Sequence, residues 1–180
     1  VVEGANSVSL ENCTVSGNMQ GTYNDDSENI QGVMIYQSMS GDADVGTASF
    51  SSKDGSITAL EGDLFYVTNT NCEISLENTQ LSSATGVILK AVGNDSARGW
   101  GESGKNGGTV VLTATNQTIE GDIIVDEISS LDMSLSEGSS LKGAVNTENS
   151  GGEINVTLDS SSAWTLTGDS YITSFNGDTS

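Results

Sequence analysis

Histidine and proline are absent from this 180-residue chain, and basic residues are few. Without histidine, neither a Ser-His-Asp nor a Cys-His relay can form, and two cysteines alone cannot complete a tetrahedral zinc site. Only 5 Lys and Arg stand against 25 Asp and Glu, which gives a formal net charge of −20. Because nucleic acids and anionic membranes attract cationic surfaces, we predict neither as a partner. We also expect no membrane insertion, since no apolar run is long enough to span a bilayer.

A short apolar motif recurs along the chain and carries most of the information on the fold. The last two copies begin at residues 133 and 156, each 23 residues after its predecessor. A repeat of this length with a strand pattern predicts a stacked array of strands. The aligned copies are Val8-Ser9-Leu10, Ala48-Ser49-Phe50, Ile74-Ser75-Leu76, Val110-Val111-Leu112, Met133-Ser134-Leu135 and Val156-Thr157-Leu158. A second apolar position follows each copy, at Val15, Ile57, Leu81, Ile119, Leu141 and Leu166.

A third apolar run completes the repeating unit, and a Gly or Asp that suits a tight corner precedes most of its copies. These runs lie at 32–36, 63–67, 86–89, 121–125 and 143–145. Three strands and three corners in about 23 residues predict an all-β fold, a single-stranded parallel β-helix (β-solenoid) of about six to seven rungs. Right-handedness is assigned as the commoner choice. We expect one domain over 1–180, cut from a longer surface protein, with very little helix.

The two cysteines, Cys13 and Cys72, fall in the first and third rungs of this alignment. Two rungs separate them by roughly 9–10 Å, because adjacent strands lie about 4.8 Å apart. The Cα atoms of a disulfide lie within about 7 Å of each other. We therefore predict two free thiols that pack as small hydrophobic residues.

Two insertions interrupt the repeat and mark where a binding function is expected. The first is shared between 19–29 and 38–46, and the second lies at 93–108. Insertions in repeat arrays form surface loops that often carry binding.

The second insertion contains the only arginine of the chain, Arg98, together with Trp100, Glu102 and Lys105. Trp and Arg are enriched in binding hot spots. We predict that these four residues, with Tyr23 of the first insertion, form a binding surface. An alternative remains open, in which Trp100 folds back to cover its own loop or an apolar groove.

Acidic residues of the first insertion, Asp25, Asp26, Asp42 and Asp44, leave a calcium site open as a weak alternative. They match neither the twelve-residue EF-hand loop nor the nonapeptide calcium repeat, so we predict no resident cofactor.

Polysaccharide lyases and hydrolases share the predicted architecture, so an enzyme needs a direct test. A hydrolase requires two carboxylates on adjacent rungs of one face. Glu77 recurs at the position of Glu11, but Ser51 lies between them in the alignment. A lyase requires a base beside clustered calcium ligands, and the register does not bring Arg98 to the acidic residues. We therefore predict that the chain is not an enzyme.

Four tracts, 32–44, 62–70, 98–101 and 164–172, resemble blocks that recur in adhesin-like surface proteins of gut anaerobic bacteria. The resemblance implies a secreted or wall-attached domain with pectin-lyase-like topology and no known catalytic set. It brings no established ligand. It also includes the Arg98–Trp100 motif, which favours a structural or shared-ligand role for that motif.

From these observations we predict an extracellular, non-catalytic adhesion module at the bacterial cell surface or secreted, monomeric as an isolated domain. Its expected partner is a host or dietary glycan or a host protein, and immunoglobulin is one example of such a protein. The alternatives are a passive structural stalk and an enzyme similar to polysaccharide lyases or hydrolases.

Overall fold

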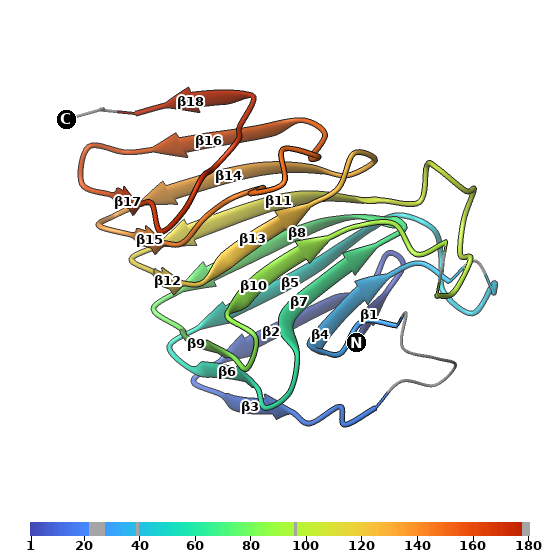
Figure 1. The fold of residues 1–180 in the computed structure, drawn as a ribbon. Helices are drawn as coiled ribbons and strands as arrows, with labels where there is room; N and C mark the ends of the chain where they lie inside the picture. Colours follow the sequence, from blue (N-terminus) through green and yellow to red (C-terminus); the bar gives the residue numbers. More distant parts are fainter. Residues whose placement is uncertain (22–27, 39, 96, 178–180) are drawn as a thin grey trace.

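The computed structural model describes residues 1–21, 28–38, 40–95 and 97–177, and strands are their only regular secondary structure (Figure 1). Within these residues no helix is long and apolar enough to cross a membrane. The strands are β1 Val2–Glu3, β2 Ser7–Glu11, β3 Thr14–Gly17, β4 Gln31–Tyr36, β5 Thr47–Lys53, β6 Ser56–Ala59, β7 Asp63–Thr68, β8 Thr70–Glu77, β9 Gln80–Ser83, β10 Val87–Ala91, β11 Gly108–Thr115, β12 Thr118–Glu120, β13 Asp122–Val125, β14 Ser130–Ser136, β15 Ser140–Lys142, β16 Ile154–Leu158, β17 Ala163–Thr165 and β18 Ser174–Asn176.

The strands form four parallel sheets, so the predicted all-β class is confirmed. The largest has seven strands in the order β18-β16-β14-β11-β8-β5-β2, and a second has five in the order β1-β4-β7-β10-β13. Two three-stranded sheets, β3-β6-β9 and β12-β15-β17, complete the molecule. Consecutive strands enter different sheets and the chain then returns to the first, as with β4, β5 and β6 followed by β7, β8 and β9. Figure 1 shows the chain rising through these sheets from β1–β3 at one end to β16–β18 at the other.

The apolar core consists of columns of side chains that stack from strand to strand. One column in the seven-stranded sheet runs through Val8, Phe50, Ile74, Leu112, Met133 and Val156. The sequence alignment placed Ala48 and Val110 in this column and was wrong by two residues at both. A two-residue slip keeps every side chain on the same face, and β5 presents three inward positions and β11 four, so the alternation alone did not fix the register.

The second predicted apolar position is confirmed for five of its copies. Val15, Ile57 and Leu81 are in register in one three-stranded sheet, and Ile119 and Leu141 are in register in the other. The sixth was wrong, because Trp164 pairs with Leu141 and Leu166 is 60% exposed. The indole N–H of Trp164 donates to the carbonyl oxygen of Gly143 at 3.0 Å, so the ring packs against the core while its polar group is satisfied.

Five corners use the same backbone conformation where the chain leaves the seven-stranded sheet. The residue that follows β2, β5, β8, β11 or β14 has a positive φ between 45° and 56°. Asn and Asp tolerate this left-handed region better than other non-glycine residues, which accounts for four of the five. The five residues are Asn12, Asp54, Asn78, Asn116 and Glu137.

Both cysteines are free thiols, as predicted. Cys72 is buried in β8 and pairs in register with Ala48 and Val110. Cys13 differs from the prediction because it is only partly buried, and its Sγ donates to the carbonyl oxygen of Glu11.

Candidate functional site

The second insertion leaves the end of β10 and returns at β11, and two buried asparagines hold its backbone in place. The Oδ1 atom of Asn94 accepts a hydrogen bond of 2.6 Å from the backbone N–H of Trp100. The Nδ2 atom of Asn106 donates to the carbonyl oxygen of Trp100 at 2.7 Å and to Asp95 Oδ1 at 2.6 Å. Asn94 is 2% exposed and Asn106 is 0% exposed, so the loop is anchored from within.

Trp100 is half-buried and folds back onto the five-stranded sheet. Its ring stacks on that of Tyr36 at the end of β4, with centroids 4.7 Å apart and planes 22° apart. The guanidinium of Arg98 lies 5.2 Å from the Trp100 ring centroid, and Arg98 Nε is 2.9 Å from Oε1 of the nearly buried Glu28. This geometry matches the alternative in which Trp100 packs intramolecularly. Trp100 therefore holds the second insertion against β4, and Arg98 joins it to the first insertion at Glu28.

The remaining predicted binding residues have different surroundings. Glu102 and Lys105 form an exposed ion pair of 2.7 Å, and such pairs contribute little to stability. Both are therefore accessible to a partner. Tyr23, Asp25 and Asp26 lie outside the described residues.

Asp42 and Asp44 line a small, exposed hollow between β4 and β5. The carboxylate of Asp42 accepts a hydrogen bond from Ser40, and the main-chain oxygen of Asp44 accepts one of 2.8 Å from the N–H of Ala5. No group of three or more His, Cys, Asp or Glu side chains that could hold a metal ion occurs in the described part of the chain. The two aspartates alone are a poor match to the six to eight oxygen ligands that calcium takes.

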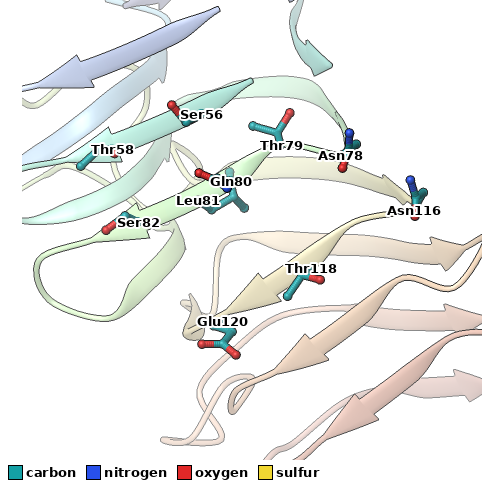
Figure 2. A pocket seen from close by; sticks show the side chains of 10 residues that line it. All are labelled: Ser56, Thr58, Asn78, Thr79, Gln80, Leu81, Ser82, Asn116, Thr118 and Glu120. Carbon is teal, nitrogen blue, oxygen red and sulfur yellow. The ribbon is translucent and has the colours of Figure 1, made fainter. Parts of the chain in front are cut away.

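An open groove of about 600 Å³ lies between the edge strands of the two three-stranded sheets, β9 of one and β12 of the other. In Figure 2, Gln80 and Ser82 of β9 and Thr118 and Glu120 of β12 lie on the two sides of this opening. Within the described part of the chain, neither β9 nor β12 has a ladder partner on the groove side, because each ends its own sheet. We call this feature the β9–β12 groove; it is lined by Ser56, Thr58, Asn78, Thr79, Gln80, Leu81, Ser82, Asn116, Thr118 and Glu120.

The groove exists because a side chain replaces the backbone ladder at its closed end. The amide of Gln117 accepts from the N–H of Thr79 at 2.8 Å and donates to the carbonyl oxygen of Thr79 at 2.6 Å. A glutamine side chain is longer than those of Thr79 and Ser139, which directly precede β9 and β15 as Gln117 precedes β12, so it holds β12 away from β9. Gln117 is 1% exposed and fully satisfied, which makes it a rigid spacer.

The groove lining is uncharged except for one carboxylate. Five side chains carry hydroxyl groups, three carry amides, Leu81 is aliphatic and Glu120 is acidic. Sequence reasoning missed these residues because each is an ordinary surface residue of a strand or a corner. The one indication in the sequence was Gln117, which is longer than the residues that precede β3, β6, β9 and β15 (Cys13, Gly55, Thr79 and Ser139).

No family model, curated protein or solved structure matches this chain.

Proposed function

We infer that the four sheets are faces of one single-stranded right-handed parallel β-helix of about six to seven rungs. The inference is supported by the order of the strands from β1 to β15, in which the chain repeatedly enters the five-stranded sheet, the seven-stranded sheet and then one of the three-stranded sheets. On this interpretation the two three-stranded sheets are one face, interrupted at the β9–β12 groove.

We propose that the chain is a non-catalytic, extracellular module of a bacterial surface or secreted protein that binds a neutral saccharide chain in the β9–β12 groove. The observation that carries the proposal is the lining of the groove. Hydroxyl and amide side chains both donate and accept hydrogen bonds, which is the chemistry that sugar hydroxyls require. The free edges of β9 and β12 add backbone donors and acceptors along the same groove.

The charge of the groove favours a neutral ligand. Glu120 is its one charged lining residue, and the chain as a whole carries a formal charge of −20. A uronide would be repelled by both, so the expected ligand is a neutral polysaccharide of dietary or host origin.

The same lining argues for binding without catalysis. Glycoside hydrolysis normally uses two carboxyl groups about 5–10 Å apart, and Glu120 is the one carboxylate that lines the groove. A lyase needs a basic side chain next to the substrate, and the described residues that line the groove include neither Lys nor Arg.

A host protein is a second candidate ligand, because the free edges of β9 and β12 also suit addition of an extended polypeptide strand. Immunoglobulin capture is one version of this alternative. A passive stalk, in which the groove binds nothing, is the remaining one.

The decisive experiment compares two arginine substitutions at exposed threonines. Thr118→Arg places a long cationic side chain across the groove, whereas Thr157→Arg lies on β16 of the seven-stranded sheet and serves as the matched control. Binding is screened on an array of neutral polysaccharides and measured by calorimetry. We expect T118R to weaken binding at least about tenfold, about 1.4 kcal/mol, and T157R to leave it unchanged.

Two further results would redirect the proposal. If Trp100→Ala abolishes binding while T118R does not, the ligand binds at the second insertion. If no neutral glycan binds but serum or mucosal proteins do, the partner is a protein. If neither the glycans nor the proteins bind, the chain is a passive stalk.

A further inference from the structure

Lys90 of β10 lies between two core residues of its strand, points away from the core and reaches the first insertion. Its Nζ atom donates a hydrogen bond of 2.7 Å to Oδ1 of Asn29 and lies 3.8 Å from Oδ2 of Asp63. Asp63 begins β7, and Asn29 lies two residues before β4. An amine, a carboxamide and a carboxylate therefore meet across three neighbouring strands, β4, β7 and β10. We call these three residues the Lys90 cluster.

The carboxylate of the cluster is buried and held in one orientation. Asp63 is 7% exposed, and its Oδ1 atom accepts a hydrogen bond of 2.6 Å from Thr85 Oγ1, so that Oδ2 faces Lys90. The backbone N–H of Asp63 donates to the carbonyl oxygen of Ile30 at 2.9 Å, which fixes the chain next to Asn29 against β7. A carboxylate fixed beside an amine is well placed to accept its proton.

Lys90 differs from the other three lysines of the chain. Its side chain is 31% exposed, whereas those of Lys53, Lys105 and Lys142 are 48–71% exposed and face carboxylates that are 41–70% exposed. Within the described part of the chain, Lys90 is also the one lysine whose ammonium donates to a side-chain amide. The Lys90 cluster therefore offers a carbonyl carbon that an amine can attack, which an exposed ion pair does not.

The hydrogen bond brings the reacting atoms close together. A carbonyl bond is about 1.23 Å long, so Cγ of Asn29 lies within about 4 Å of Lys90 Nζ. Reactive geometries place the two atoms about 3–3.5 Å apart, so a small rotation of either side chain is enough. Among the described residues, the amide nitrogen of Asn29 makes only long hydrogen bonds, of 3.3 Å to the carbonyl oxygen of Ile30 and 3.5 Å to Gln31 Oε1. A cavity of about 20 Å³ beside Asn29 has room for one molecule of the size of water or ammonia.

We propose that Lys90 and Asn29 become joined by an intramolecular isopeptide bond, which the folded chain forms with Asp63 as the proton acceptor. The lone pair of the uncharged Nζ attacks Cγ of Asn29 and forms the new C–N bond. Asp63 takes one proton from Nζ and returns it to Nδ2 as the old C–N bond breaks. The amide nitrogen leaves as ammonia with the electron pair of that bond. One amide is exchanged for another, so the reaction needs no oxidant and no further reactant.

The bond fastens the first insertion to β10 across β7. Asn29 and Lys90 are 61 residues apart in the sequence, so the bond closes a long covalent loop. Such a loop lowers the conformational entropy of the unfolded chain, as a disulfide does. Both cysteines of this chain are free thiols, so this is the covalent brace that the fold can form. The proposal is independent of the β9–β12 groove, because no residue of the Lys90 cluster lines that groove.

Intact mass spectrometry of the purified chain tests the proposal. We expect the chain to be lighter than its sequence mass by one ammonia molecule. Trypsin should release residues 1–53 and 54–98 as one linked product that is not cleaved after Lys90, because an acylated lysine is not a trypsin site. A cyclic imide at Asn106-Gly107 or Asn176-Gly177 has the same mass loss, but hydroxylamine opens an imide and leaves an isopeptide bond intact.

Three variants separate the roles of the residues. Lys90→Arg keeps the positive charge without an amine, and Asp63→Asn keeps the shape of the side chain without a proton acceptor. We expect both variants to retain the full sequence mass. Lys142→Arg is the matched control, because Lys142 also lies near a carboxylate, and it should still lose ammonia. The melting temperature should fall by about 10 °C in K90R and stay constant in K142R.

Three results would overturn the proposal. The first is a folded parent chain that keeps its full sequence mass even after long incubation at about pH 9, where a larger fraction of a lysine amine is uncharged. The second is loss of ammonia by K90R, which would place the missing mass elsewhere in the chain. The third is linkage in D63N at the rate of the parent chain, which would show that Asp63 does not accept the proton.

Discussion

At the level of single residues, the two free cysteines have different environments. Cys72 is buried in β8, and this burial, together with the charge of Glu73, raises the pKa of its thiol to about 12. Cys13 follows β2 and is partly exposed. A thiol reacts as its thiolate, so the two cysteines should react at different rates.

We expect a thiol reagent at about pH 8 to label Cys13 quickly and Cys72 only after unfolding. The unfolded thiol ionises near about pH 8.5, so the stability that Cys72 contributes is complete below that pH and is lost progressively as pH rises toward about 12. The free energy of unfolding, measured with urea, should therefore fall less between about pH 7.5 and about pH 10.5 in Cys72→Ala than in the parent chain. Equal labelling rates in the native state would contradict this expectation, and Cys13→Ala should remove the fast phase.

At the level of elements, the corner that follows β14 is the one in its series occupied by neither Asn nor Asp. Glu137 has a φ of 56°, and its equivalents are Asn12, Asp54, Asn78 and Asn116. The left-handed conformation costs an ordinary L-residue about 1–2 kcal/mol, and Asn less. Glu137 therefore stores local strain that its equivalents largely avoid.

We expect Glu137→Asn to raise the free energy of unfolding by about 0.5–1 kcal/mol. The reverse exchange, Asn116→Glu, should lower it by a similar amount and is the matched control. Both positions are exposed, so changes in core packing are avoided. Urea denaturation measures both variants, and a destabilised E137N would show that the corner is set by side-chain contacts and not by φ.

How well each strand could be predicted depended on the sequence pattern that marks it. Continuous apolar runs that follow a Gly or Asp placed β4, β7, β10 and β13 correctly, whereas the run at 143–145 was wrong as a strand, since it forms only an isolated bridge from Val145 to Ile123. Alternation left the alignment of Ala48 and Val110 undetermined, since an even slip preserves the face of every residue. The β9–β12 groove was not predicted, because the sequence does not show which strands fail to pair; Gln117 indicates only that one corner differs from the others. Nor could the sequence show that the buried side-chain amide of Gln37 has no hydrogen-bond partner among the described residues, because this depends on the position of every neighbouring atom.

At the level of the whole molecule, negative charge is the dominant feature. Each of the five basic side chains is within 4 Å of a carboxylate, at Lys53–Glu77, Lys90–Asp63, Arg98–Glu28, Lys105–Glu102 and Lys142–Glu120. The formal charge of −20 means that most carboxylates have no basic counterpart. Repulsion among them opposes the compact state, keeps the protein soluble and makes stability sensitive to ionic strength.

We expect the melting temperature to rise as NaCl is raised from about 0.01 M to 0.5 M, because the Debye length falls from about 30 Å to a few ångströms and the repulsion is screened. Magnesium and calcium chlorides at matched ionic strength should have similar effects on each other, since general screening does not distinguish two divalent cations. Calorimetric melting in the three salts measures this. If sub-millimolar calcium raises the melting temperature well beyond magnesium, a specific calcium site exists. Asp42→Asn with Asp44→Asn would then show whether it involves the described aspartates or lies with Asp25 and Asp26, because only a site on the described pair loses the calcium-specific rise in that variant.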